Sequence, residues 1–133
     1  MPLGYTINRN NGYVLVVYRG NPTIAQWTAV MRRALSDPAY QTGFGFLLDR
    51  RLAKGPPTTP FVRATLAFSE ANRARLGASR WAVVVTDAAS FGMARMGQIL
   101  AEHQQIGAFT DMASAEAWLR GGRPRDIESP LGE

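Results

Sequence analysis

The amino-acid sequence predicts a single α/β domain with a mixed, mostly parallel sheet, built from an N-terminal β-hairpin and alternating helices and strands. Three observations predict this class. Two strand-like segments flank the turn Asn-Arg-Asn-Asn-Gly at 8–12. Two later runs, 44–49 and 80–87, are continuously apolar in the way of buried parallel strands. The segments between the runs repeat apolar residues at helical spacing. The expected order is ββαβαβαβα, with right-handed crossovers that place the helices against the sheet.

The first three elements follow from turn and cap signals. Segments 5–7 and 13–19 are rich in β-branched and aromatic residues, and the asparagines and glycine between them tolerate positive φ, which favours a hairpin. Thr23 and Gln26 have the spacing of a capping box, so a helix is expected to begin there and to end before Pro38. Its apolar face would contain Ile24, Trp27, Met31, Ala34 and Leu35.

The middle of the chain is predicted as strand, loop and helix. The strand 44–49 ends in a carboxylate, Asp49. The following segment 50–59 (Arg-Arg-Leu-Ala-Lys-Gly-Pro-Pro-Thr-Thr) is too rich in glycine and proline for regular structure. Thr59 and Pro60 suit the cap and first position of a helix that would run to Leu76.

The C-terminal part repeats the alternation. A strand at 80–87 precedes a helix that is expected to end near Gly107. A short strand at 108–111 and a final helix at 112–120 complete the domain, which we therefore place at 1–120. The tail, 121–133, has little apolar surface to bury, and we expect it to be mobile.

Composition excludes several classes of site. The chain has 133 residues, is 46% hydrophobic, and contains no cysteine, so disulfides, thiolate catalysis and cysteine metal sites are excluded. The N-terminus shows no signal-peptide pattern, and no apolar run approaches the roughly 20 residues of a membrane span. We therefore expect a cytoplasmic protein with no membrane span.

The positive charge is concentrated in the middle of the sequence. The net charge is +5, and the segment 50–80 carries seven basic residues against one acid, Glu70. Such a patch attracts anions, but it lacks the interleaved aromatic residues and the motifs of a nucleic-acid groove. A solvated basic face is the expected interpretation, and nucleic acid is not an expected partner.

This order of elements and several sequence words resemble the SpoIIAA-like family of small bacterial proteins, which is described as STAS/SEC14-like. The resemblance covers roughly residues 5–120. It rests on Gly-x-x-Thr at 20–23, Phe-Leu-Leu-Asp-Arg-Arg at 46–51, Ala-Val-Val-Val-Thr-Asp at 82–87, Phe-Gly-Met-Ala-Arg-Met at 91–96, and Phe-Thr-Asp with Ala-Glu-Ala-Trp-Leu at 109–119.

The resemblance implies a SpoIIAA/STAS-like fold and two kinds of function. Related anti-sigma-factor antagonists act through protein contacts and are phosphorylated on a serine after the third strand, whereas SEC14-like relatives hold a lipid. This chain departs from the first pattern, because Asp49 is followed by two arginines and a loop, not by Asp-Ser-Ser/Thr-Gly. The hydroxyls left as candidates for phosphorylation are Thr58 and Thr59.

Three predicted strands end in aspartate, at the sheet edge where α/β proteins bind ligands. Asp87 and Asp111 directly precede helices, so capping explains them. Asp49 precedes a loop and is the candidate for acid–base chemistry or metal binding, or for an ion pair with Arg50, Arg51 or Lys54. We expect neither a bound metal nor another cofactor.

The helix after residue 87 contains three stripes at helical spacing. The large apolar stripe, expected to face the sheet, is Ala89, Met93, Met96, Leu100 and His103. The small-residue stripe, which would be filled by a neighbouring helix, a second subunit or a ligand, is Ser90, Ala94, Gly97 and Ala101. In a continuous helix His103 would lie roughly 20 Å from Ser90, too far for a nucleophile–base pair.

Phe91 heads the third, polar stripe beside Arg95, at the start of the helix. A large aromatic residue there is expected to cover a loop, a subunit or a ligand, and Gly92 would allow close approach. The candidate ligand or partner site lies between this helix start and the 50–59 loop. It comprises Asp49, Arg50, Arg51, Ser90, Phe91, Gly92, Met93, Arg95 and Met96.

These observations leave three hypotheses for function. The first is a non-enzymatic regulatory or protein-interaction module that forms homodimers or higher oligomers. The second is a carrier or sensor of a small apolar molecule with an anionic head group. The third, an enzyme that uses Asp49, has the least support because no catalytic constellation, P-loop or metal-ligand spacing is present in the sequence.

Overall fold

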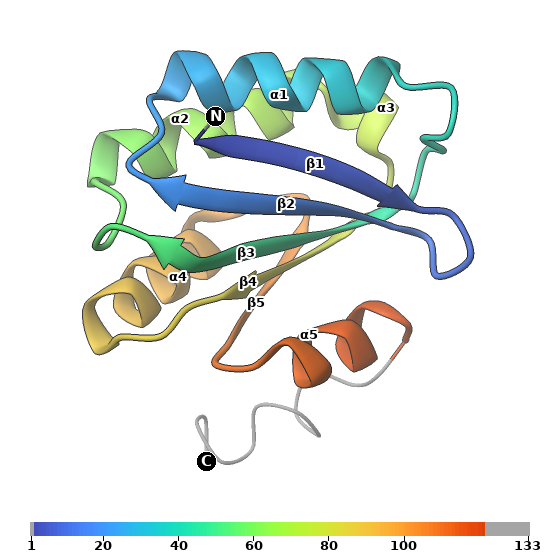
Figure 1. The fold of residues 1–133 in the computed structure, drawn as a ribbon. Coiled ribbons are helices and arrows are strands. Elements are labelled where there is room, and N and C mark those ends of the chain that lie inside the picture. The colour runs from blue at the N-terminus through green and yellow to red at the C-terminus, as the bar shows by residue number, and fades with distance from the viewer. Residues whose placement is uncertain (1, 122–133) are drawn as a thin grey trace.

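A five-stranded sheet organises the domain (Figure 1). The computed structural model describes residues 2–121. The strands lie side by side in chain order; the first pair is antiparallel and every later pair is parallel. They are β1 (Leu3–Asn8), β2 (Tyr13–Gly20), β3 (Gly45–Ala53), β4 (Arg80–Val84) and β5 (Gln105–Phe109). The predicted hairpin and mostly parallel sheet are confirmed.

The helices lie on both faces of the sheet. They are α1 (Ile24–Ser36), α2 (Thr59–Ala71), α3 (Arg73–Leu76), α4 (Ala88–Leu100) and α5 (Met112–Leu119). Because the parallel strands follow chain order, right-handed crossovers place α1, α2 and α4 on the same face. α5 follows the last strand and packs on the opposite face, below the sheet in Figure 1.

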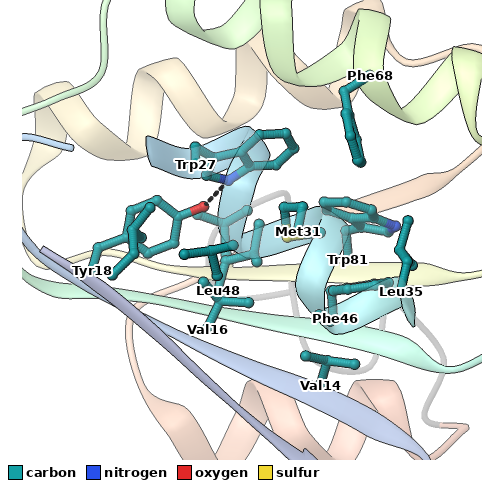
Figure 2. Packing of buried hydrophobic residues seen from close by; sticks show 14 of the residues in the cluster. Val14, Val16, Tyr18, Trp27, Met31, Leu35, Phe46, Leu48, Phe68 and Trp81 are labelled. Atoms are coloured by element: carbon teal, nitrogen blue, oxygen red, sulfur yellow. Dashed lines mark hydrogen bonds between the residues drawn. The ribbon is translucent and has the colours of Figure 1, made fainter. Parts of the chain in front are cut away.

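The face beneath α1 and α2 contains the larger core, shown in Figure 2. There the Nε1–H of Trp27 donates to the hydroxyl of Tyr18 at 2.8 Å. Phe46 of β3 stacks on Trp81 of β4 with ring centroids 4.4 Å apart. Trp27 is positioned by the predicted capping box, in which Thr23 and Gln26 exchange hydrogen bonds of 3.1 and 2.8 Å. The start of α1 is therefore confirmed.

The opposite face is a smaller core closed by α5. It contains Leu47, Ala82, Phe109 and Trp118, all buried. Close packing here requires a glycine in β5, because a Cβ on Gly107 would lie 2.7 Å from a ring carbon of Phe109 and 3.2 Å from Trp118.

β3 is longer than the sequence predicts. It continues to Ala53, so Arg50 and Arg51 belong to the strand and not to the loop. The cause is its neighbour, since β2 also continues, and Arg19 and Gly20 pair with Leu52 and Ala53. The helix that follows is capped by Thr58, not Thr59, because the Thr58 Oγ accepts the N–H of Phe61 at 3.2 Å.

Two later boundaries also differ from the prediction. The helix expected at 59–76 is divided at Asn72 into α2 and α3. α4 ends at Leu100, because residues 105–107 pair with β4 and extend β5 toward its N-terminal end. His103 therefore lies in the connection and not in a helix; its Nε2 is 2.7 Å from Nη1 of Arg73. The expected mobile tail falls outside the described residues, Gly121 excepted.

Candidate ligand-binding site

A cavity of about 80 Å³ lies between α2, α4 and the sheet, on the face that α1, α2 and α4 cover. Tyr18 and Leu48 line it from β2 and β3, and Trp27 lines it from α1. These three side chains point into the same part of the core in Figure 2. Val62 of α2 and Met93 of α4 form the opposite wall. The cavity is therefore bounded by apolar and aromatic groups from most layers of the fold.

Hydroxyl groups on the cavity wall are occupied by hydrogen bonds within the protein. Thr65 donates to the carbonyl of Val62 at 2.7 Å, and Ser69 donates to the carbonyl of Thr65 at 3.0 Å. Ser90 donates to the Oδ2 of Asp87 at 2.9 Å. Each of these hydroxyls already donates to a backbone carbonyl or a carboxylate, so they are poor anchors for a ligand.

Arg50 differs from these groups. Its side chain lines the cavity and is 9% exposed, and its guanidinium carbon lies 4.8 Å above the ring of Tyr18. One terminal nitrogen donates to the carbonyl of Gly55 at 3.5 Å. The Nε is buried and has no hydrogen-bond partner. A buried donor without a partner costs free energy, so its presence requires an explanation.

Among residues 2–121, no carboxylate oxygen lies within 4.0 Å of an Arg50 nitrogen, so Arg50 forms no ion pair there. Burial lowers the pKa of Arg50, and the Tyr18 side chain and the Asp87 charge partly oppose that shift. A guanidinium stays protonated in proteins, so Arg50 is a buried cation at neutral pH. A buried cation without a directly paired anion creates a strong preference for an anionic group.

Strand alternation explains why Arg50 reaches this cavity. Phe46 and Leu48 belong to the core beneath α1 and α2, and Leu47 belongs to the core beneath α5. Side chains alternate between the faces of a strand, and Arg50 lies against Tyr18 on the face that α1, α2 and α4 cover, whereas Arg51 pairs with Asp49. β3 extends past Asp49 through this point, where its pairing with β2 shifts register between Val17 and Arg19.

A second cavity, of about 300 Å³, adjoins the first. The two share Arg50, Pro57 and Phe61 as lining residues. Lys54 and Thr58 line the second cavity as well, and within the described part of the chain no acidic residue lines it. We call the first the inner cavity and the second the outer cavity.

The candidate residues from the sequence do not gather in one place. Arg50, Ser90 and Met93 line the inner cavity, and Thr58 lines the outer one. Thr59 is the exposed first residue of α2.

Asp49 and Arg51 lie on the opposite face of β3. Nε and Nη2 of Arg51 donate to the two carboxylate oxygens of Asp49, each at 2.9 Å. Burial raises the pKa of Asp49, but the hydrogen bonds from the side chain and backbone of Arg51 outweigh burial and hold that pKa below its ordinary value. The ion pair that the sequence offers as one reading of Asp49 is thus formed with Arg51.

The other candidates lie on α4 outside the cavity lining. Phe91 is half-buried against the main core, with the guanidinium of Arg95 6.0 Å from its ring centroid. Gly92 is exposed and Met96 is half-buried.

α4 is turned differently from the prediction. The small-residue stripe faces the protein, since Ser90 and Gly97 are buried, whereas Ala89 of the large stripe is exposed. A Cβ on Gly97 would lie 3.6 Å from a methyl carbon of Val62. The helix that fills this stripe is therefore α2 of the same chain, one of the alternatives the sequence left open.

Sequence reasoning missed the aromatic side of the site. Tyr18 and Trp27 were predicted only as strand and core residues, and Trp81 likewise. Nothing in their local sequence distinguishes a cavity wall from filled core. Alternation along β3 is the signal that could have placed Arg50 with them, had the strand been extended beyond Asp49.

Within the described part of the chain, no group of three His, Asp or Glu side chains is placed to hold a metal ion. No helix among residues 2–121 is long and apolar enough to cross a membrane.

Comparison with known proteins supports the fold. No protein-family model matches the chain, and no curated protein matches it. Among solved structures, it is similar to an uncharacterised protein of the DUF3478 family from Shewanella loihica PV-4, whose crystal structure has a SpoIIAA-like fold. The TM-score is 0.62 and the identity 17%, over 88% of this chain and 91% of the other. The resemblance seen in the sequence is thereby confirmed for the fold: this chain has a SpoIIAA-like fold.

Proposed function

We propose that this domain binds a small aliphatic molecule carrying an anionic group, as a carrier or sensor and not as an enzyme. The observation that carries the proposal is Arg50. Its cation is buried against an apolar cavity, its Nε has no partner, and no carboxylate of the described residues pairs with it. An anionic ligand would balance this buried charge, and its apolar part would occupy the inner cavity.

The volume of the inner cavity limits the apolar part. At about 80 Å³ it is half the size of the roughly 150 Å³ cavity that accepts benzene in an engineered protein. A short aliphatic group fits such a space, whereas the long acyl chain of a membrane lipid does not. The proposal is accordingly narrower than the lipid binding of SEC14-like relatives.

Asp49 gives little support to the enzyme hypothesis. Its carboxylate is held by Arg51 on the sheet face opposite both cavities. A carboxylate used as a general base must reach the substrate, and this one is separated from the candidate site by the sheet.

The proposal is tested by titrating the protein with n-butyrate, n-butyl phosphate and 1-butanol, which share one aliphatic group. Trp27 and Trp81 line the inner cavity, so their fluorescence reports its occupancy, and calorimetry gives the affinity. We expect at least one of the two anions to bind saturably and at least tenfold more tightly than 1-butanol, because a hydrogen bond to a charged group contributes about 1.5–3 kcal/mol.

The matched variants are Arg50→Met and Arg32→Met. Both remove one arginine charge, but Arg32 is exposed on α1 and lines neither cavity. Binding is expected to weaken at least tenfold in Arg50→Met and to stay within twofold in Arg32→Met. If both variants bind the anion as the unmodified protein does, Arg50 is not the anion's partner and the proposal is wrong.

A second candidate function is contact with another copy of the chain. It is favoured by a groove of about 410 Å³ between α2 and the end of α4. Leu66, Ala67 and Leu100 form its apolar part, and Arg63 and Glu70 stand at its polar part. An apolar centre with charges of both signs around it is typical of a protein interface. Ile99, next to the groove residue Leu100 in the chain, is 81% exposed.

A further inference from the structure

The outer cavity carries an inference that rests on the proposed function and makes its ligand more specific. We infer that the anionic group is a phosphate monoester, held in the outer cavity between Arg50 and Lys54, with the short aliphatic group of the same molecule in the inner cavity.

The two cavities are continuous. Arg50, Pro57 and Phe61 line both, so the guanidinium of Arg50 stands where the apolar space meets the basic one. The inner cavity measures about 80 Å³ and the outer cavity about 300 Å³. A molecule can therefore place a small apolar end in the inner cavity and a larger anionic end in the outer one.

The outer cavity is positively charged. Arg50 and Lys54 bring two cations to it, and no acidic side chain among residues 2–121 lines it. The cavity also includes Thr58, the N-cap of the thirteen-residue helix α2, where the helix dipole adds partial positive charge. A carboxylate carries one negative charge, whereas a phosphate monoester carries about 1.5–2 at pH 7 and so matches two cations better.

The wall of the outer cavity also has hydrogen-bonding capacity. Arg50 lines it, and the hydrogen bond from one terminal nitrogen of its guanidinium to the carbonyl of Gly55 is long, at 3.5 Å. The Oγ of Thr58 accepts the N–H of Phe61, which leaves the hydroxyl proton available to a ligand. Lys54 adds an ammonium that has three donors. A phosphate monoester has three oxygens that can accept hydrogen bonds from Arg50, Thr58 and Lys54, whereas a carboxylate has two.

The loop that lines the outer cavity has little conformational freedom. The loop between β3 and α2 contains Pro56 and Pro57, and it is joined to β2 by the hydrogen bond from Lys54 N–H to the carbonyl of Gly20 at 2.8 Å. Proline fixes φ, so little conformational freedom of this loop remains to be lost on binding. The wall of the outer cavity is therefore prepared before the ligand arrives.

The experiment compares n-butyl phosphate, n-butyrate and inorganic phosphate by calorimetry in low salt. In the unmodified protein we expect n-butyl phosphate to bind at least tenfold more tightly than either of the other two. Its affinity should fall as the pH is lowered from 7 to 5, because a phosphate monoester takes up a proton with a pKa of about 6. The affinity of n-butyrate should change little over that range.

The variant that tests the phosphate site is Lys54→Met, with Arg32→Met as its control. Both residues are exposed cations, but Arg32 lines neither cavity and lies outside the groove between α2 and α4. Lys54→Met should weaken n-butyl phosphate at least fivefold and leave n-butyrate within twofold, whereas Arg32→Met should leave both within twofold. Lys54 is exposed, so its replacement does not disturb the core.

Different failures are distinguishable. If n-butyrate binds as tightly as n-butyl phosphate and Lys54→Met has no effect, the phosphate inference is overturned while binding through Arg50 stands. If inorganic phosphate binds as tightly as n-butyl phosphate, the aliphatic group does not use the inner cavity, and the inference is again overturned. If neither organic anion binds, the proposed function fails together with the inference.

Discussion

At the scale of single residues, Arg50 is the position where stability and function oppose each other. Its guanidinium is buried, and it is compensated within the described residues by one carbonyl, the Tyr18 side chain and the more distant Asp87 charge. Folding must therefore remove a charge from water without an ion pair, which is unfavourable. Such a residue is explained more readily by what it binds than by what it contributes to folding.

This imbalance gives a prediction about stability. Arg50→Met should leave the free energy of unfolding unchanged or raise it by up to about 4 kcal/mol, because buried charges replaced by apolar groups of similar volume often stabilise. Urea denaturation, with Arg32→Met as the exposed control, measures the change. A loss of more than about 1 kcal/mol would show that the buried charge is satisfied within the folded protein.

At the scale of elements, α4 shows how packing overrides a periodicity argument. The sequence places its methionines toward the sheet, yet Ser90 and Gly97 are the buried residues and Ala89 is exposed. The small stripe lets α4 approach α2, and the inner cavity lies between these helices and the sheet. Met93 lines this cavity, and Met96 and Leu100 are half-buried.

The glycines of α4 and β5 provide the corresponding prediction. Gly92→Ala and Gly97→Ala should each stabilise by about 0.5–1 kcal/mol, since glycine is unfavourable within a helix. The space allows it, because a Cβ at Gly92 meets nothing within 4 Å and one at Gly97 makes an ordinary contact with Val62.

The contrasting variant is Gly107→Ala. Its Cβ would lie 2.7 Å from a ring carbon of buried Phe109, so this change should destabilise by about 1–3 kcal/mol. Thermal denaturation of the three variants measures the order. Destabilisation by Gly97→Ala would contradict the helix contact described above.

At the scale of the whole molecule, the covering of the sheet decides which surfaces remain for partners. α1, α2 and α4 share one face, and this arrangement leaves the groove between α2 and α4 at the surface. If the domain self-associates there, a charge placed in the groove should dissociate it.

We therefore expect Ala67→Glu to lower the sedimentation coefficient to that of a monomer. Ala29→Glu is the matched control, because Ala29 is also an exposed alanine within a helix but lies on α1, away from the groove. A single species of monomer mass for the unmodified protein at high concentration would dispose of the self-association hypothesis.

The sequence by itself determined the order of elements, the hairpin and the capping box of α1. These features depend on residues close together in the chain: Thr23 and Gln26 are one turn apart, and Asn10 to Gly12 form one turn. Local steric preferences and hydrogen bonds are sufficient to encode them.

Only the tertiary structure decided which side chains surround Arg50. β3 continues past Asp49 because β2 continues beside it, and that extension turns Arg50 toward Tyr18 and Arg51 toward Asp49. The burial of Ser90 and Gly97 was likewise decided by α2, a helix about thirty residues earlier in the chain. These outcomes depend on contacts between distant segments, which form only when the sheet and its helices are packed together.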